Sequence, residues 1–129
     1  MKRDVLIANG SLALREELQT LFERAQLSTT SCASASEMRH ALGSHAYALV
    51  VLGIVLSDGD GLELLKTIKA ARTPVLLLSS KTAVASRILA LGVGPDDYAE
   101  PPVACHEAAK VPPASRSVKS HVQPFLRSP

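Results

Sequence analysis

Residues 47–61 constrain the fold of this chain more than any other stretch. They begin with an apolar run, residues 47–52, that is as short and as rich in branched side chains as a buried strand. Gly53 ends the run, and a turn-rich segment, residues 57–61, leads into an amphipathic stretch that begins at Leu62. The pattern predicts a strand, a loop and a helix. In an open parallel sheet, ligands and chemistry lie in the loops after the central strands, so Gly53, which has no side chain, occupies an informative position.

The remainder of the chain repeats the alternation of strand and helix. Strands are predicted near residues 4–8, 27–32, 75–78 and 97–99, and helices near residues 11–25, 34–42, 62–69 and 82–91. Such βα units build a parallel sheet that is covered on both faces. Right-handed crossovers leave few topologies for five strands. We therefore expect an α/β fold of the flavodoxin-like type, a doubly wound five-stranded parallel sheet with the strand order 2-1-3-4-5.

The last part of the chain is less regular. We expect one domain over residues 1–103 and an irregular segment over residues 104–129. Residues 104–110 have the composition for a short helix, but two prolines soon follow, and residues 117–125 have a helical apolar pattern with Pro124 inside it. The last covering helix is therefore predicted to be irregular or interrupted.

Composition limits the class of function. Apolar residues make up 47% of the chain and charged residues 20%, as in a globular domain, and the formal net charge of +2 is too small to indicate a nucleic-acid or membrane partner. Aromatic residues make up only 3%, too few for the stacking platforms of a single-strand nucleic-acid binder. No apolar run approaches the ~20 residues that span a bilayer, and the N-terminus has no signal-type apolar region. These features predict a cytoplasmic protein.

The side chains that bind metals or act as nucleophiles form no recognisable set. Cys32 and Cys105 lie far apart without metal-type spacing and are expected to be free thiols, and the histidines show no ligand spacing. Ser79 and Ser80 have no histidine in a corresponding loop to activate them as nucleophiles. We therefore expect no metal, no cofactor and no enzymatic activity.

Several separated motifs stand in the order and at the spacing found in one known family. They are the apolar residues 5–7 before a helix that contains residues 15–18, the strand and turn of residues 49–61, and three later stretches, residues 74–81, 87–92 and 94–98. On these motifs, residues 3–103 resemble the receiver domains of bacterial two-component response regulators. The resemblance implies a protein partner in a signalling pathway: a histidine kinase, another response regulator, or a second copy of the chain.

The resemblance does not extend to the charged residues of the family's site. Receiver domains accept a phosphoryl group from a histidine kinase on one aspartate, which holds Mg²⁺ together with an acidic pair, while a lysine binds the phosphoryl oxygens. In this chain the acidic pair falls on Asn9 and Gly10, the phosphoacceptor on Gly53 and the lysine on Pro101. Because none of these residues is charged, phosphotransfer and the metal site are predicted to be lost.

Two uncharged positions of the family's site are kept. The hydroxyl-bearing position falls on Ser79 and the switch aromatic on Tyr98, whereas the loop proline is replaced by Ser57. We expect Tyr98 to contribute to a docking face together with the helix predicted at residues 82–91. The chain is therefore predicted to be a pseudo-receiver, a phosphorylation-independent protein–protein interaction module in phosphorelay signal transduction.

Three alternatives remain open. Asp58 and Asp60 are the carboxylates nearest to Gly53, and either is a candidate for a displaced phosphoacceptor or cation site, although Asp-Gly-Asp-Gly sequences more often form turns and helix caps. The second alternative is a flavodoxin-like small-ligand binder, with a pocket where the family has its acidic site. The third is a relic without a selected function.

Overall fold

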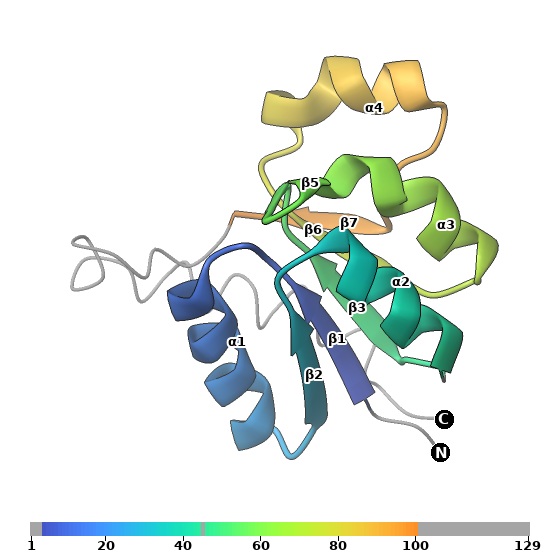
Figure 1. Cartoon of the computed structure of the whole chain (residues 1–129). Helices are drawn as coiled ribbons and strands as arrows, with labels where there is room; N and C mark the ends of the chain where they lie inside the picture. The colour runs from blue at the N-terminus through green and yellow to red at the C-terminus, as the bar shows by residue number, and fades with distance from the viewer. Residues whose placement is uncertain (1–3, 45, 101–129) are drawn as a thin grey trace.

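A five-stranded parallel sheet forms the centre of the computed structural model, which describes residues 4–44 and 46–100 (Figure 1). Its strands are β1 (Asp4–Ala8), β2 (Ser28–Cys32), β3 (Leu49–Leu52), β6 (Val75–Leu78) and β7 (Asp97–Ala99), in the order β2-β1-β3-β6-β7. All pairings between neighbours in this sheet are parallel. Counted in chain order, these strands follow the order 2-1-3-4-5, so the predicted flavodoxin-like topology is confirmed.

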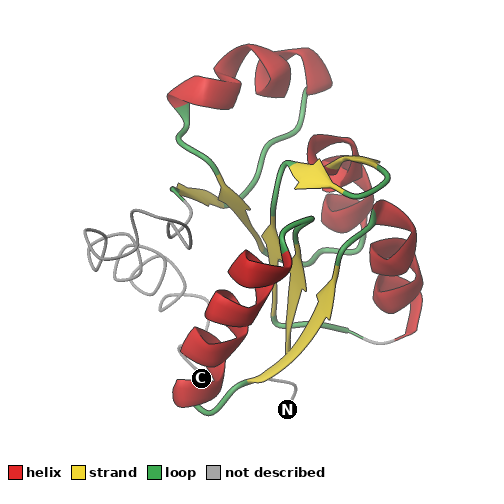
Figure 2. Ribbon diagram, turned by 60° about the vertical axis from the view of Figure 1, so that its left-hand side comes forward, coloured by secondary structure: helices red, strands yellow, loops and turns green. Residues whose placement is uncertain are grey.

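Helices connect the strands on both faces of the sheet. The α-helices in the described ranges are α1 (Leu12–Arg24), α2 (Ala35–Ser44), α3 (Leu65–Ala70) and α4 (Ala85–Leu91), and the 3-10 segments are η1 (Gly61–Leu64) and η2 (Thr82–Val84). Figure 2 shows α1 on one face of the sheet and α2 and α3 on the other. The helices predicted at residues 62–69 and 82–91 are present, but each begins with a tighter 3-10 turn. The helix predicted at residues 34–42 continues to Ser44.

The core is aliphatic and has one layer on each face of the sheet. Along β1, Val5 and Ile7 face the layer that α1 completes with Phe22, whereas Leu6 and Ala8 face the layer of α2 and α3. The β1 residues after Asp4 are all 0% exposed. Because both faces are buried, such strands need no polar alternation, which explains why they were recognisable as continuous apolar runs.

The turn-rich loop after β3 contains a feature that the sequence did not predict. β4 (Val55–Leu56) and β5 (Gly59–Asp60) pair antiparallel and form a small hairpin, which we call the edge hairpin. Its first strand alternates, with Val55 73% exposed and Leu56 only 4% exposed in the α2–α3 layer. A buried leucine therefore anchors the hairpin to the core. An alternation of two residues is too short for recognition in a sequence.

Some predictions fall outside the described residues. These are the position of Pro101, the thiol of Cys105, the boundary at residue 103 and the irregular segment of residues 104–129. Across residues 4–44 and 46–100, no helix has both the length and the apolar character needed to cross a membrane.

Asp96 joins three elements, a role that its sequence position did not indicate. Its Oδ2 atom accepts a hydrogen bond from Val75 N at 2.8 Å, and its own N donates to Val75 O at 2.9 Å. Lys69 Nζ donates to both carboxylate oxygens, at 3.0 and 2.9 Å. The end of α3, the start of β6 and the loop before β7 are thereby tied together.

The substitution Asp96→Ala is expected to lower the free energy of unfolding by about 2 kcal/mol, because it leaves the buried N–H of Val75 without its charged acceptor. Urea denaturation monitored by circular dichroism measures the change. The control Lys69→Gln removes only the half-exposed ion pair and should lower the same quantity by less than about 1 kcal/mol. Equal losses in the two variants would contradict the role assigned to the backbone contact.

Candidate functional site

The sheet brings the ends of β1 and β3 side by side. Ala8 is the register partner of Leu52, so the residues that follow these strands, Asn9 and Gly53, meet at the carboxyl edge. Gly53 N donates a hydrogen bond to Ala8 O at 2.7 Å. A Cβ atom built on Gly53 would clash with the Asn9 amide nitrogen Nδ2. The Asn9 side chain therefore lies in the space that any side chain at position 53 would need first.

Hydrogen bonds hold Asn9 in this place. Its Oδ1 atom accepts from Ser11 N at 2.8 Å, and its backbone oxygen accepts from Arg15 Nη1 at 2.8 Å. The amide oxygen is thus directed to the start of α1 and the amide nitrogen to Gly53. A neutral amide, on Asn9, and a glycine, Gly10, stand where the family resemblance places an acidic pair, and the Arg15 guanidinium lies beside Asn9.

Ser79 follows β6 at the same edge of the sheet and is buried, with 7% of its surface exposed. Its Oγ atom donates to Ser80 O at 2.9 Å, and its N donates to Leu77 O at 3.0 Å. Ser80 Oγ in turn accepts from Ala83 N, within η2, at 3.1 Å. The hydroxyl groups of both serines are therefore used to shape the loop between β6 and α4.

Gly10 and Gly61 bring backbone into close contact around Gly53. Gly10 N donates to Val55 O at 2.9 Å, and Gly61 N donates to Ile54 O at 2.6 Å. A Cβ atom on Gly61 would collide with the Gly53 carbonyl oxygen, and one on Gly10 would lie 2.9 Å from Val55 O. Both positions need glycine because backbone of the loop after β3 occupies the space of a side chain.

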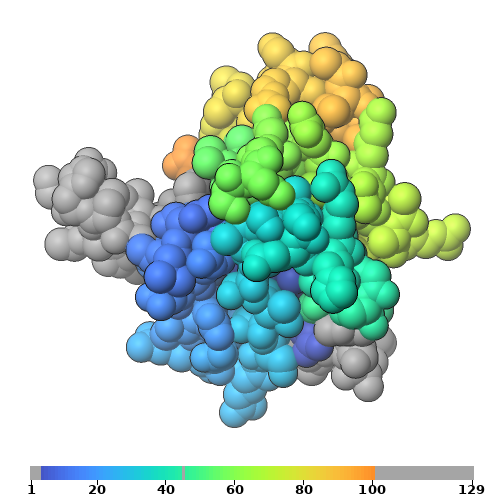
Figure 3. Space-filling model, viewed as in Figure 1, coloured from blue at the N-terminus to red at the C-terminus, as the bar shows by residue number. Residues whose placement is uncertain are grey.

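The edge hairpin lies between the starts of several helices, as Figure 3 shows by the green atoms that border the blue start of α1, the cyan start of α2 and the yellow atoms of α4. Ser57 N donates to Ala33 O at 2.8 Å, just before α2. Together with the bond between Gly10 N and Val55 O, this contact ties the loops after β1, β2 and β3 to one another.

Asp58, the first candidate for a displaced phosphoacceptor, caps α2. Its carboxylate oxygens accept from Ala35 N at 2.7 Å and from Ser36 N at 3.2 Å. The hydrogen bond from Ala35 is the largest cause that lowers the pKa of the Asp58 carboxyl below its ordinary value of 3.8. The cap crosses more than twenty residues of sequence, so local spacing did not reveal it.

Asp60, the second candidate, has two partners. Its Oδ1 atom accepts from Leu62 N at 2.9 Å and caps η1, and its Oδ2 atom forms an ion pair with Arg87 Nη2 on α4. Sequence analysis did not single out Arg87 or Arg15 as residues of this edge. Only the fold brings their guanidinium groups there, and nothing in their spacing would have revealed it.

The donor atoms at this edge do not fit Mg²⁺, the ion that the family resemblance implies. Asn9 presents its amide nitrogen, its backbone oxygen already accepts from a guanidinium, and the Gly53 carbonyl is packed against Gly61. Such an ion is normally bound through one or two carboxylates, and none of these groups is anionic. The His, Cys, Asp and Glu residues of the described ranges form no group of three or more that would hold a metal ion.

Cys32, at the end of β2, is a buried free thiol, as predicted. Burial, helped by the nearby Glu37 carboxylate and opposed by Arg15, raises the pKa of the thiol to about 11. The thiolate is therefore scarce at neutral pH, and the residue is a poor nucleophile.

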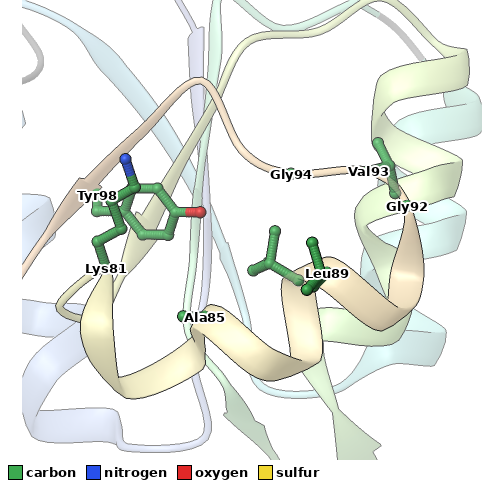
Figure 4. A pocket seen from close by; sticks show the side chains of 8 residues that line it. Lys81, Ala85, Leu89, Gly92, Val93, Gly94 and Tyr98 are labelled. Carbon is green, nitrogen blue, oxygen red and sulfur yellow. The ribbon is translucent and has the colours of Figure 1, made fainter.

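Tyr98 lies on β7 beside a hollow of about 370 Å³ that is separate from Gly53. Figure 4 shows its hydroxyl pointing into this hollow, which is bounded by α4 and the loop after it. A Cβ atom on Gly94 would lie 3.2 Å from Ile88 Cγ2 and 3.8 Å from the Tyr98 hydroxyl, so a side chain at this position would fill part of the hollow. The small-ligand alternative predicts a pocket at the Gly53 edge and not beside Tyr98. At the Gly53 edge, the Asn9 side chain occupies the space next to the glycine.

Comparison with known proteins gives a consistent result at the family level. The family model described as response regulator receiver domain matches residues 5–110. The transcriptional activator protein PfeR of Pseudomonas aeruginosa is 36% identical over 104 residues, which are 80% of this chain and 34% of that protein. The transcriptional regulatory protein BasR of Escherichia coli is 38% identical over 95 residues, which are 70% of this chain and 43% of that protein. The chain thus spans less than half the length of these relatives.

Solved structures show the same fold. A two-component response regulator from Clostridium difficile has a TM-score of 0.77 at 25% identity, covering 98% of this chain and 97% of that chain. A CheY-like response regulator receiver domain protein from Methanospirillum hungatei has a TM-score of 0.78 at 20% identity, covering 98% and 94%.

The substitution Gly61→Ala is expected to destabilise the domain by about 3 kcal/mol, because the new methyl group must displace backbone at Gly53. Chemical denaturation measures the loss. Gly43→Ala is the matched control: its methyl group would meet nothing within 4 Å inside α2, so it should stabilise the domain by up to about 1 kcal/mol. A neutral effect of Gly61→Ala would show that the loop after β3 is not closely packed.

The Asp58 cap predicts a pH dependence of stability. Because the folded pKa is lowered, the ionised cap stabilises the fold above the ordinary carboxyl pKa, and this contribution is lost as the pH falls through the folded value. The thermal midpoint of Asp58→Ala should therefore lie below that of the wild type at pH 7, and the difference should shrink as the pH falls below the ordinary carboxyl value of 3.8. Asp58→Asn keeps an acceptor oxygen and should lose less. A constant difference across this range would contradict the assignment.

Proposed function

Because this chain belongs to the response regulator receiver domain family, we propose that it is a pseudo-receiver, a domain that works through protein–protein contacts without accepting a phosphoryl group. On this proposal, the domain acts in two-component signalling in the cytoplasm and is not an enzyme. Relatives of the chain are named as transcriptional regulators, but this domain by itself is proposed to bind protein and not nucleic acid.

The observation that carries the proposal is the contact between Asn9 and Gly53. An acceptor position needs a carboxylate nucleophile, and a transferred phosphoryl group needs cations and donors that neutralise its charge. Here the position has no side chain, and an amide nitrogen stands over it. The fold of the family is therefore combined with an edge that lacks both the nucleophile and the ligands of the ion.

The contacts of Asp58 and Asp60 support this proposal over a displaced acceptor. For Asp58 to attack phosphorus, it would have to leave the N–H groups of Ala35 and Ser36 without their acceptor. Asp60 would have to give up the cap of η1 and its pairing with Arg87. Both carboxylates already have structural partners, which disfavours their use as nucleophiles.

We place the interaction surface on α4 and β7, around Tyr98. Leu89 on α4 is 85% exposed, more than the other exposed large hydrophobics of the described residues, Leu12 and Val55, and it lines the same hollow as Tyr98. Exposed apolar and tyrosine side chains are typical of docking sites for proteins. The proposed partner is a histidine kinase, another response regulator or a second copy of this chain.

Incubation of the purified chain with acetyl phosphate and Mg²⁺, followed by intact mass spectrometry, tests the central claim. No gain of a phosphoryl mass is expected, under conditions in which a receiver with its aspartate in place is modified. A gain that is abolished by Asp58→Asn or Asp60→Asn would overturn the proposal in favour of a displaced acceptor.

The substitution Gly53→Asp should not restore phosphorylation. Even when the Asn9 amide moves aside for the new side chain, Asn9 and Gly10 offer no negative charge to a metal ion. The same mass measurement checks this expectation. Uptake of a phosphoryl group by Gly53→Asp alone would show that the remaining residues of the edge still support the chemistry.

Co-purification from the native cell tests the proposed surface. A two-component signalling protein should be recovered with the wild type and reduced at least about tenfold with Tyr98→Ala or Leu89→Ala, since the core of an interface dominates its affinity. Leu12→Ala is the control, because Leu12 is also exposed, at 58%, but lies on α1. An equal loss with the control would place the surface elsewhere.

A further inference from the structure

Helix α4 is held to the rest of the domain by few contacts. It has seven residues, none of which is fully buried, and the hollow beside Tyr98 lies along it. Ile88 and Leu91 are only partly buried against the core. Figures 1 and 2 show α4 joined to the sheet through a loop at each end. Elements with so little buried surface open locally more often than the core does.

The position of Asp60, by contrast, is well fixed by hydrogen bonds. The edge hairpin that carries it is bonded to Gly10, to Ala33 and, through Asp58, to the start of α2. Leu62 N also donates to Oδ1 of the same carboxylate, so the orientation of the side chain is already set. The usual entropic loss on forming a surface ion pair is therefore reduced on this side of the contact.

We propose that the ion pair between Asp60 and Arg87 is a latch that holds α4 in one position over the carboxyl edge of the sheet. Arg87 lies in the first turn of α4, and its side chain is 48% exposed against 30% for Asp60. The inference rests on the proposed function in one respect: a domain without a phosphoryl switch needs another means of fixing the helix that carries its docking surface.

The size of the effect follows from the exposure of the pair. A solvent-exposed ion pair changes an equilibrium by a factor of about 1.5 to 5, which is minor for the unfolding of a whole domain. The free energy of local opening of a short helix with no buried residue is much smaller than that of unfolding, so the same factor is a large part of it. Loss of the latch should therefore speed the hydrogen exchange of α4 measurably and leave the free energy of unfolding of the whole domain nearly unchanged.

Hydrogen–deuterium exchange of the full chain tests the latch. In Asp60→Asn and in Arg87→Gln, amides of α4 should exchange about threefold faster than in the wild type, while those of β1 and β3 stay unchanged. Asparagine is also a good N-cap, so Asp60→Asn keeps the η1 cap and removes only the charge. The double variant should exchange no faster than either single variant, because both remove the same interaction.

Lys66→Gln is the control, since it removes an exposed positive charge from α3 without touching the pair. It should leave α4 exchange unchanged. Unchanged exchange in Asp60→Asn and Arg87→Gln, additive effects in the double variant, or an equal effect of Lys66→Gln would each overturn the proposal.

Salt gives a second readout. Because the pair is exposed to solvent, raising the ionic strength should speed α4 exchange in the wild type but not in Asp60→Asn. A salt effect of equal size in both proteins would also overturn the proposal.

Neither the exchange measurement nor the salt measurement uses a phosphodonor or a partner. Phosphoryl uptake would therefore count against the proposed function and leave the latch standing, whereas unaltered exchange would remove the latch alone.

Discussion

The close approach of three backbone segments at Gly53 is the constraint on which the rest of this edge depends. Ala8 O accepts from Gly53 N, the Asn9 amide lies over the glycine, and Gly61 packs against its carbonyl oxygen. On the function proposed above, the space in which a receiver domain binds an ion and a phosphoryl group is filled here by the Asn9 amide and by backbone. Positions 9, 10 and 53 carry no anionic side chain, and the edge is a close contact between loops.

The edge hairpin is held in place by contacts of the same kind. Backbone hydrogen bonds tie it to the loops after β1 and β2, while Asp58 and Asp60 cap two helical segments. A divalent ion in a receiver would draw loops together through shared ligands; here uncharged contacts and two caps join the loops. The carboxylates that sequence alone offered as displaced acceptors serve this framework, and the structural interpretation of the Asp-Gly-Asp-Gly segment accounts for both of them.

Much of the fold was accessible from local pattern. Continuous apolar runs predicted β1, β3 and β6, because strands buried on both faces need no polar alternation. The outer strands β2 and β7 are more polar and only partly buried, and their prediction rested on their place in the alternation of strand and helix. The ends of elements were less accessible: α2 passes Gly43, where a side chain would have open space, and two helices begin as 3-10 turns. The hairpin was missed because its pairing involves two residues on each strand.

The sequence by itself determined the alternating strands and helices, through short-range patterns, and the absence of a carboxylate at positions 9, 10 and 53, through residue identity. The strand order followed from these elements only together with the rule that crossovers are right-handed. Only the tertiary structure decided what the remaining charges do. Asp58 meets Ala35, Asp60 meets Arg87 and Asp96 meets Val75 across more than twenty residues in each case. Such partners are chosen by the way the chain folds back on itself, and no local spacing encodes them.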